Sequence, residues 1–242
     1  MYRTVMPALS TLLVCSACAT SQPTLSHAHI GHSLTGWHDT PDQAGLFVVA
    51  ERESRNALDE IALAQRSVAD VCAARDHVKN VVHSLNPELE PTGTGLGYGA
   101  LRALEGARKH VGFAAETKDA SESVVYLEQE FGEHAAAATD QLLIALATAR
   151  SAIAAPPGEI ASRLPELEDA LRHGVYGKDL DHDGIVGSLP EESGVVQLRM
   201  QLSDLIANEV EPPYRPVSKR HLFGVTRNDE GHWVYDFDSA AH

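Results

Sequence analysis

The sequence predicts a mainly α-helical protein built as an antiparallel helical bundle. Hydrophobic residues make up 43% of the 242 residues and alanine is frequent, which suits a helical core rather than a disordered chain. Apolar residues recur three or four positions apart between residues 42 and 210, in about five or six segments separated by proline and glycine. Since short connections favour antiparallel neighbours, we expect one bundle over 42–210.

The first segment of the bundle, 42–85, carries a long apolar stripe and contains no proline. At ~1.5 Å per residue it would exceed ~60 Å, so we expect a kink or a split. Val68 lies on the stripe and Cys72 lies beside it, and we expect both side chains to be buried.

The remaining helices are expected between clear breaks in the pattern. Asn86-Pro87 ends the first segment, and the glycine-rich stretch 93–99 follows. No strand precedes these glycines and no Gly-Lys-Ser/Thr follows them, so we interpret them as an interhelical loop rather than a nucleotide loop. Further helices are predicted over about 99–117, from 119–121 to about 154, from 160 to the acidic run at 179, and from 190 to 210.

The start of the chain is typical of a targeting segment. Arg3 precedes a short apolar run, and small residues then lead to Cys18. This pattern resembles a bacterial lipoprotein cleavage site, which implies that residues 1–17 are a signal peptide and that the Cys18 sulfur carries lipid. Ala19 beside that cysteine implies the periplasmic face of the outer membrane. The alternative is an ordinary signal peptide that ends near Ala19 or Thr20. Residues 18–41 would form a lipidated tether and a histidine-rich segment.

The chain is strongly acidic, with a formal net charge of −15. Such a surface repels phosphate backbones, so we expect no nucleic-acid partner. Divalent cations or a cationic partner would suit it better.

The run Asp-Leu-Asp-His-Asp-Gly over 179–184 offers three carboxylates at alternate positions, closed by the turn-forming Gly184. It resembles the front half of an EF-hand calcium loop, over about a dozen residues, which implies a calcium ion in a helix–loop–helix with the loop at 179–192. Position twelve is Pro190, so the closing carboxylate comes late or from elsewhere. The alternative is an acidic turn without metal. The expected calcium ligands are Asp179, Asp181, Asp183, the Ile185 carbonyl, Glu191 and Glu192.

Thirteen histidines are the second chemical feature. His27, His29 and His32 form His-Ala-His-Ile-Gly-His, and His38 follows closely. In an extended segment, His-x-His presents two imidazoles to one ion, so these four residues predict a nitrogen-rich site for copper, zinc or nickel. The alternative is that these histidines, which lie near the predicted tether, are merely polar residues without a metal.

His110 and His134 each lie within a small or apolar helical stripe. If their helices are neighbours, the two rings could meet and bind metal or haem; otherwise each is a hydrogen-bonded core histidine. No recognisable catalytic motif is present. We therefore expect a non-enzymatic accessory lipoprotein with a structural calcium ion. The alternatives are a transition-metal binder and, third, a haem protein or enzyme that uses His110 and His134.

The C-terminal tail, 211–242, changes character after two prolines. Trp233, Tyr235 and Phe237 alternate as on one face of a strand, and a turn-rich segment precedes them. We expect a short β-hairpin. Because an isolated hairpin is barely stable in water, it either packs on the bundle or contacts a partner protein.

Overall fold

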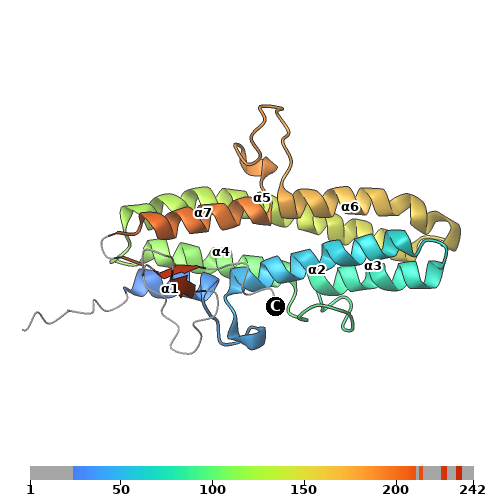
Figure 1. Ribbon diagram of the computed structural model, residues 1–242, viewed down its shortest axis with the longest axis horizontal. Helices are drawn as coiled ribbons and strands as arrows, with labels where there is room; N and C mark the ends of the chain where they lie inside the picture. Colours follow the sequence, from blue (N-terminus) through green and yellow to red (C-terminus); the bar gives the residue numbers. More distant parts are fainter. Residues whose placement is uncertain (1–23, 211–212, 215–224, 228–232, 236–242) are drawn as a thin grey trace, which may run out of the picture.

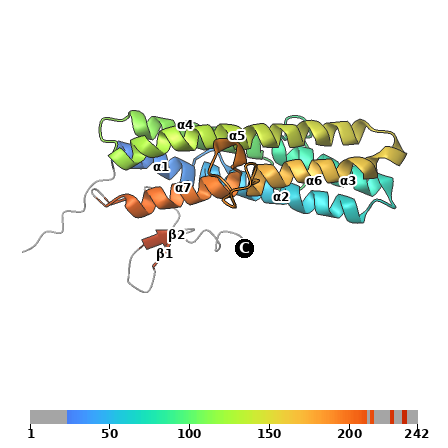
Figure 2. The same cartoon turned by 90° about the horizontal axis from the view of Figure 1, so that it is seen from above.

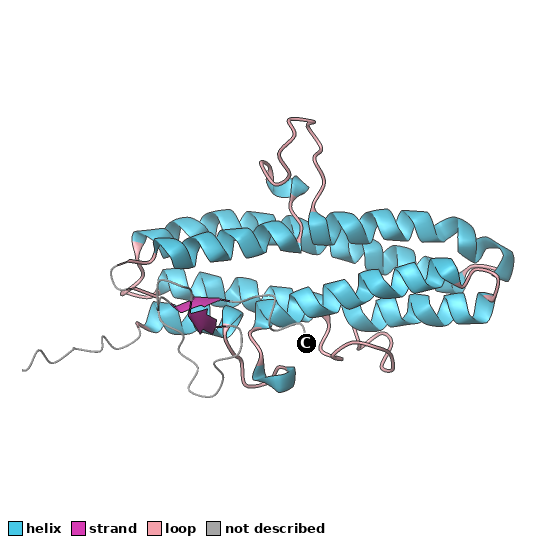
Figure 3. Cartoon of the chain, viewed as in Figure 1, coloured by secondary structure: helices cyan, strands magenta, loops and turns pink. Residues whose placement is uncertain are grey.

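The computed structural model describes residues 24–210, 213–214, 225–227 and 233–235. Over these residues the protein is mainly helical, as predicted, with seven α-helices (Figures 1 and 3). None of the described helices is both long enough and apolar enough to cross a membrane. The helices are α1 Leu25–Leu34, α2 Leu46–Arg66, α3 Val71–Leu85, α4 Ala100–Glu116, α5 Glu122–Ala154, α6 Ile160–Tyr176 and α7 Val195–Asn208, with short 3-10 turns at Pro41–Gln43, Pro157–Glu159 and Pro190–Glu192.

The helices are arranged as antiparallel rods that lie side by side (Figures 1 and 2). Helix α5, with 33 residues, is continuous and is ~50 Å long at ~1.5 Å per residue. The other rods each consist of two helices placed end to end: α1 with α2, α3 with α4, and α6 with α7. Loops at 35–45, 86–99 and 177–194 interrupt these rods and leave the bundle near its middle. The chain therefore follows an up-down-up-down course with three interruptions.

One apolar core holds the rods together. Phe47 on α2 and Phe131 on α5 are fully buried, and their rings meet edge to face at 6.3 Å. Alanines line much of the buried face of α5, which allows the neighbouring helices to approach closely. Two helix starts are capped by side chains: the Ser121 hydroxyl accepts from the Val124 amide, and the Asp70 carboxylate accepts two amides of α3.

The predicted split of the 42–85 segment occurs at residues 67–70, between α2 and α3. The turn reverses the chain, so α2 and α3 pack against each other as an antiparallel pair. Val68 lies in this turn and is exposed, and Cys72, in the first turn of α3, is exposed too. The expectation that both are buried is wrong because helical spacing was extended through a turn.

The glycine-rich loop is an interhelical loop, as predicted, and a buried glutamate fixes it. The Glu53 carboxylate, on α2, accepts the amides of Tyr98 at 2.9 Å, Gly99 at 3.0 Å and Leu96 at 3.1 Å. Gly95 has φ +105°, and a Cβ there would lie 2.5 Å from Oε2 of Glu53, so only glycine fits. A carboxylate of the protein itself thus occupies the anion-favouring N-terminus of α4.

Strands β1 Val225–Arg227 and β2 Trp233–Tyr235 pair antiparallel, with Thr226 opposite Val234 (Figure 2). Most of the tail around them lies outside the described residues. The aromatic hairpin and its docking therefore stay predictions. Residues 1–23, with the predicted signal peptide and Cys18, lie outside the described residues as well.

Candidate metal centre

Residues 25–34 form helix α1 rather than the extended segment that the sequence suggested. The Thr24 hydroxyl caps the helix by accepting the His27 amide at 3.0 Å. In an extended chain His27 and His29 would share a face, but in a helix residues three apart do so. His29 and His32 therefore point the same way, towards α4, and His27 points elsewhere.

Three imidazoles converge between two helices: His29 and His32 come from α1, and His110 comes from α4. Nδ1 of His29 lies 3.2 Å from Nδ1 of His110, and Nδ1 of His32 lies 3.3 Å from the same atom. The ligand atoms of all three residues lie within 4.8 Å of one another, and the group could hold a metal ion. In a tetrahedral site with metal–nitrogen bonds of ~2.0–2.1 Å, neighbouring nitrogens are ~3.3–3.4 Å apart. Both measured separations are close to that edge length.

Hydrogen bonding alone accounts poorly for this convergence. A ring nitrogen offers either one N–H or one lone pair, both in the plane of the ring. Nδ1 of His110 therefore cannot form a well-directed hydrogen bond with His29 and with His32 at the same time. Three lone pairs directed at one cation would satisfy all three nitrogens.

The surroundings keep the imidazoles neutral, which is the form that binds metal. Burial, and then the neighbouring rings of His32 and His29, lower the pKa of His110 from 6.5 to about 4. Burial also lowers the pKa of His32, helped by His29 and His38. The pKa of His29 is lowered by burial, against an opposing effect of Asp119. All three rings are thus in the ligand form at neutral pH.

Aromatic rings flank the cluster on different sides. Trp37 packs against His32 and His110, with ring centroids 4.6 Å apart in each case, and Phe113 packs against His29 and His110 at 5.6 and 5.7 Å. His38, which the sequence placed in the site, is exposed and packs on Trp37 at 4.4 Å. It contacts the cluster through Trp37 rather than belonging to the converging group.

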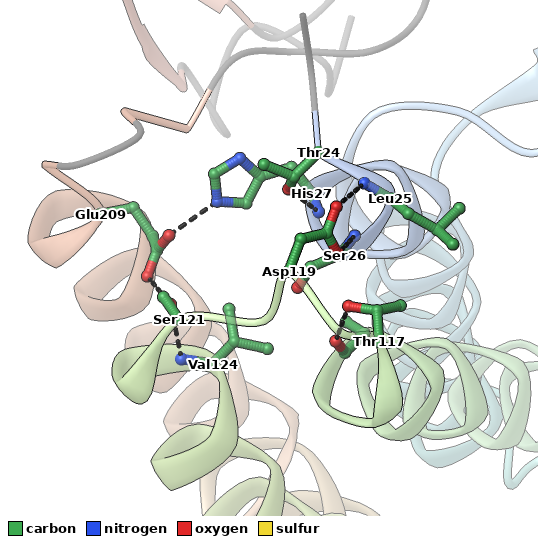
Figure 4. A network of polar contacts seen from close by, with 10 residues as sticks. Thr24, Leu25, Ser26, His27, Thr117, Asp119, Ser121, Val124 and Glu209 are labelled. Carbon is green, nitrogen blue, oxygen red and sulfur yellow. Dashed lines mark hydrogen bonds and ion pairs between the residues drawn. The ribbon is translucent and has the colours of Figure 1, made fainter.

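His27 serves a structural contact, not the cluster. Its Nε2 lies 2.6 Å from Oε2 of Glu209 at the end of α7, and both side chains are almost fully buried (Figure 4). The other oxygen of Glu209 accepts the hydroxyl of Ser121, the cap of α5. The prediction that His27 is a ligand together with His29 is therefore not supported by the geometry, because α1 is helical.

A second contact, made by Asp119, holds the first turn of α1 in place. The Asp119 carboxylate, in the loop between α4 and α5, accepts the amides of Leu25 at 2.7 Å and Ser26 at 3.2 Å (Figure 4). Ile30 and Leu34 enter the core from the same helix. Helix α1 is therefore held along its length, which fixes the side of the helix on which His29 and His32 lie.

His110 and His134 have different partners. Nδ1 of His134 lies 2.6 Å from the Ser193 hydroxyl, and both residues are buried between α5 and the start of α7. The facing pair of His110 and His134, one of the two alternatives that the sequence left open, does not form. His134 is a hydrogen-bonded core histidine, while His110 joins α1.

The acidic loop projects from the side of the bundle between α6 and α7 (Figures 1 and 3). Ligand oxygens of Asp179, Asp181 and Glu192 lie within 4.8 Å of one another, so this group could also hold a metal ion. Gly184 has φ +85°, as the predicted sharp turn requires. Helices α6 and α7 continue one another along α5 on either side of the loop.

Glu192 has a role that its late position in the loop did not reveal. Its carboxylate is buried and accepts the amides of Leu180 and Asp181 on one oxygen. The other oxygen accepts the Ser188 hydroxyl and the amides of residues 187–189. The Leu180 amide and the other donors lower the pKa of Glu192 to about 2. Glu192 thus holds residues 180–181 and residues 187–189 of the loop together. Glu191 is exposed, and its backbone carbonyl lies 2.9 Å from Nε2 of His173.

The carboxylates at the tip of the acidic loop also bind its own backbone. Asp179 accepts the amides of His182 at 2.6 Å and Gly184 at 3.0 Å, and Asp183 accepts the Ile185 amide at 2.7 Å. Such turns order the loop without an ion. Ile185, whose carbonyl is one of the expected calcium ligands, is 61% exposed, so this part of the loop faces the solvent.

No family model matches this chain, and no curated protein or solved structure matches it either. Within the described part of the chain, the structure is a helical bundle with two groups of side chains that could hold metal ions.

Proposed function

We propose that this protein binds one transition-metal ion, zinc, copper or nickel, through Nδ1 of His29, His32 and His110, and that it stores or passes on that ion without catalysing a reaction. The observation that carries the proposal is the approach of two α1 imidazoles to one α4 imidazole at 3.2 and 3.3 Å. Imidazole nitrogen is a ligand suited to these metals, and the net charge of −15 raises the local concentration of cations.

Zinc titration by calorimetry tests this proposal on the chain without residues 1–17. His110→Ala should weaken zinc binding at least ~100-fold, because losing even a group that only hydrogen-bonds to a metal ligand costs ~10–100-fold. His182→Asn, an exposed histidine of the acidic loop, should leave the affinity unchanged within about twofold. Equal affinities for the wild type and His110→Ala would refute the proposal.

His27→Gln separates the geometry from the sequence pattern. Because His27 binds Glu209, its replacement should lower stability yet change zinc affinity by less than about twofold. A large loss of zinc affinity in a folded His27→Gln protein would instead favour the extended His-x-His site.

We also propose a structural calcium ion in the acidic loop, supported by the grouping of Asp179, Asp181 and Glu192. Asp181→Ala should then lower the melting temperature in calcium and have little effect after chelation. Equal losses in both conditions would mean that Asp181 acts through its hydrogen bond to the Asp183 amide alone.

For the cellular address we propose a lipid anchor at Cys18 on the periplasmic face of the outer membrane, supported by the sequence around that residue. Cys18→Ser should abolish incorporation of labelled palmitate and release the protein from the membrane fraction. Retention of label would exclude Cys18 as the lipidated residue. The aromatic tail, 211–242, is proposed as a contact for a partner protein.

A further inference from the structure

Among the residues that the structure describes, the histidine cluster supplies three protein ligands, all neutral. Tetrahedral sites that bind three protein side chains keep a fourth position for an exogenous ligand. Three imidazoles also leave the full charge of a divalent ion uncompensated. A ligand that carries a negative charge on its donor atom would therefore be favoured at that position.

A pocket of about 590 Å³ lies next to the cluster on one side. It is lined by Leu25 and His29 from α1, Phe113 and Glu116 from α4, and the following loop 117–119. His29 belongs both to the pocket and to the cluster. Phe113 lines the pocket and also packs against His29 and His110. The pocket and the cluster therefore lie next to each other between α1 and α4.

The His32 side of the cluster carries a second aromatic ring. Trp37 packs against His32 and His110, and His38 packs on Trp37. The loop that carries Trp37 is closed by the Thr40 hydroxyl, which donates to the Trp37 carbonyl at 2.8 Å. An exogenous ligand would therefore approach from the His29 and Phe113 side.

The pocket walls indicate the rest of the ligand. Leu25 and Phe113, 61% and 47% exposed, offer apolar surface, while Lys118 contributes a positive charge and Glu116 a negative one. The Asp119 carboxylate is already used by the amides of Leu25 and Ser26. We propose that a small carboxylate with an apolar body completes the coordination of the metal from this pocket. This inference rests on the metal site proposed above.

Cobalt(II) in place of zinc makes the test visible, since its absorption bands change with coordination. Azide, a small anion, reports whether a coordination position is open. Benzoate, a carboxylate with an apolar ring, reports whether the pocket accepts the ligand. Both should change the spectrum of the cobalt-loaded protein, and benzoate should compete with azide.

Reversing the charge of Lys118, which lines the pocket, then tests whether benzoate binds there. Lys118→Glu should weaken benzoate binding about five- to tenfold, since it replaces an attraction by a repulsion. Lys109→Glu makes the same charge change on the outer side of α4 and should weaken it less than twofold. Cobalt affinity should be equal in both variants.

The outcomes separate the two proposals. Failure to bind cobalt would refute the metal site and this inference together. Bound cobalt with no response to azide would mean a closed coordination sphere, which overturns the inference while the metal site stands. A response to azide but not to benzoate, or equal effects of Lys118→Glu and Lys109→Glu, would overturn the pocket as the place of the ligand.

Discussion

Acidification should destabilise the metal-free protein through His110. The pKa of this ring is lowered from 6.5 to about 4 by burial and by its histidine neighbours. At pH 5 the unfolded chain carries a proton on this imidazole and the folded chain does not. The unfolded state then binds more protons, so the free energy of unfolding falls as the pH drops through 6.5 towards 4.

The size of this loss follows from the two pKa values. At pH 5, which is ~1.5 pH units below the ordinary histidine pKa of 6.5, protonation of the ring stabilises the unfolded state relative to pH 7.5. At ~1.36 kcal/mol per unit this amounts to about 2 kcal/mol. The His110 ring is only partly buried, so solvent screening reduces this to about 1 kcal/mol. Replacing the ring by an amide removes that contribution.

Urea unfolding of the metal-free protein, followed by circular dichroism at both pH values, measures the effect as a difference. The loss on acidification should be about 1 kcal/mol smaller in His110→Gln than in the wild type. His182→Asn, whose side chain is exposed and whose φ of +65° asparagine tolerates, should lose as much as the wild type. An equal loss of unfolding free energy in the wild type and in His110→Gln would mean that the His110 ring does not cause this pH dependence.

The two buried glutamates whose carboxylates accept loop amides, Glu53 and Glu192, give further expectations. Glu53→Gln replaces one oxygen that accepts backbone amides by a donor, so it should lower the free energy of unfolding by about 2–4 kcal/mol, whereas the exposed Glu88→Gln should change it by less than ~0.5 kcal/mol. Thermal unfolding checks this, and similar melting temperatures for the two variants would contradict it. Glu192→Gln should speed amide exchange across 180–189, while the exposed Glu191→Gln should not; unchanged exchange in Glu192→Gln would show that the loop holds without this carboxylate.

Periodicity was sufficient for the bundle because α2, α3, α4 and α5 each carry apolar residues at helical spacing that match their buried faces. It was insufficient for α1. That segment has only Leu25, Ile30 and Leu34 as large apolar residues, and it is helical because Ile30 and Leu34 enter the core. Packing, rather than local propensity, decides such short helices.

The candidate site depended on that helix. The sequence pattern indicates His29 and His32 but groups them with His27 and His38, because His-x-His shares a face only in an extended segment. His110 stands in an apolar stripe, and its partners on α1 are 81 and 78 residues away in the chain, so no local pattern connects them. The three-residue spacing of His29 and His32 was the available signal for a shared helical face.

Zinc binding to three particular nitrogens can be observed atom by atom. The experiment is a zinc titration followed by NMR of ¹⁵N-labelled histidines, with assignments from single His→Asn variants. We expect the Nδ1 signals of His29, His32 and His110 to shift together and to saturate at one zinc per chain, while the signals of His27 and His134 stay in place. Saturation with shifts at His27 or His38 and none at His110 would contradict this expectation.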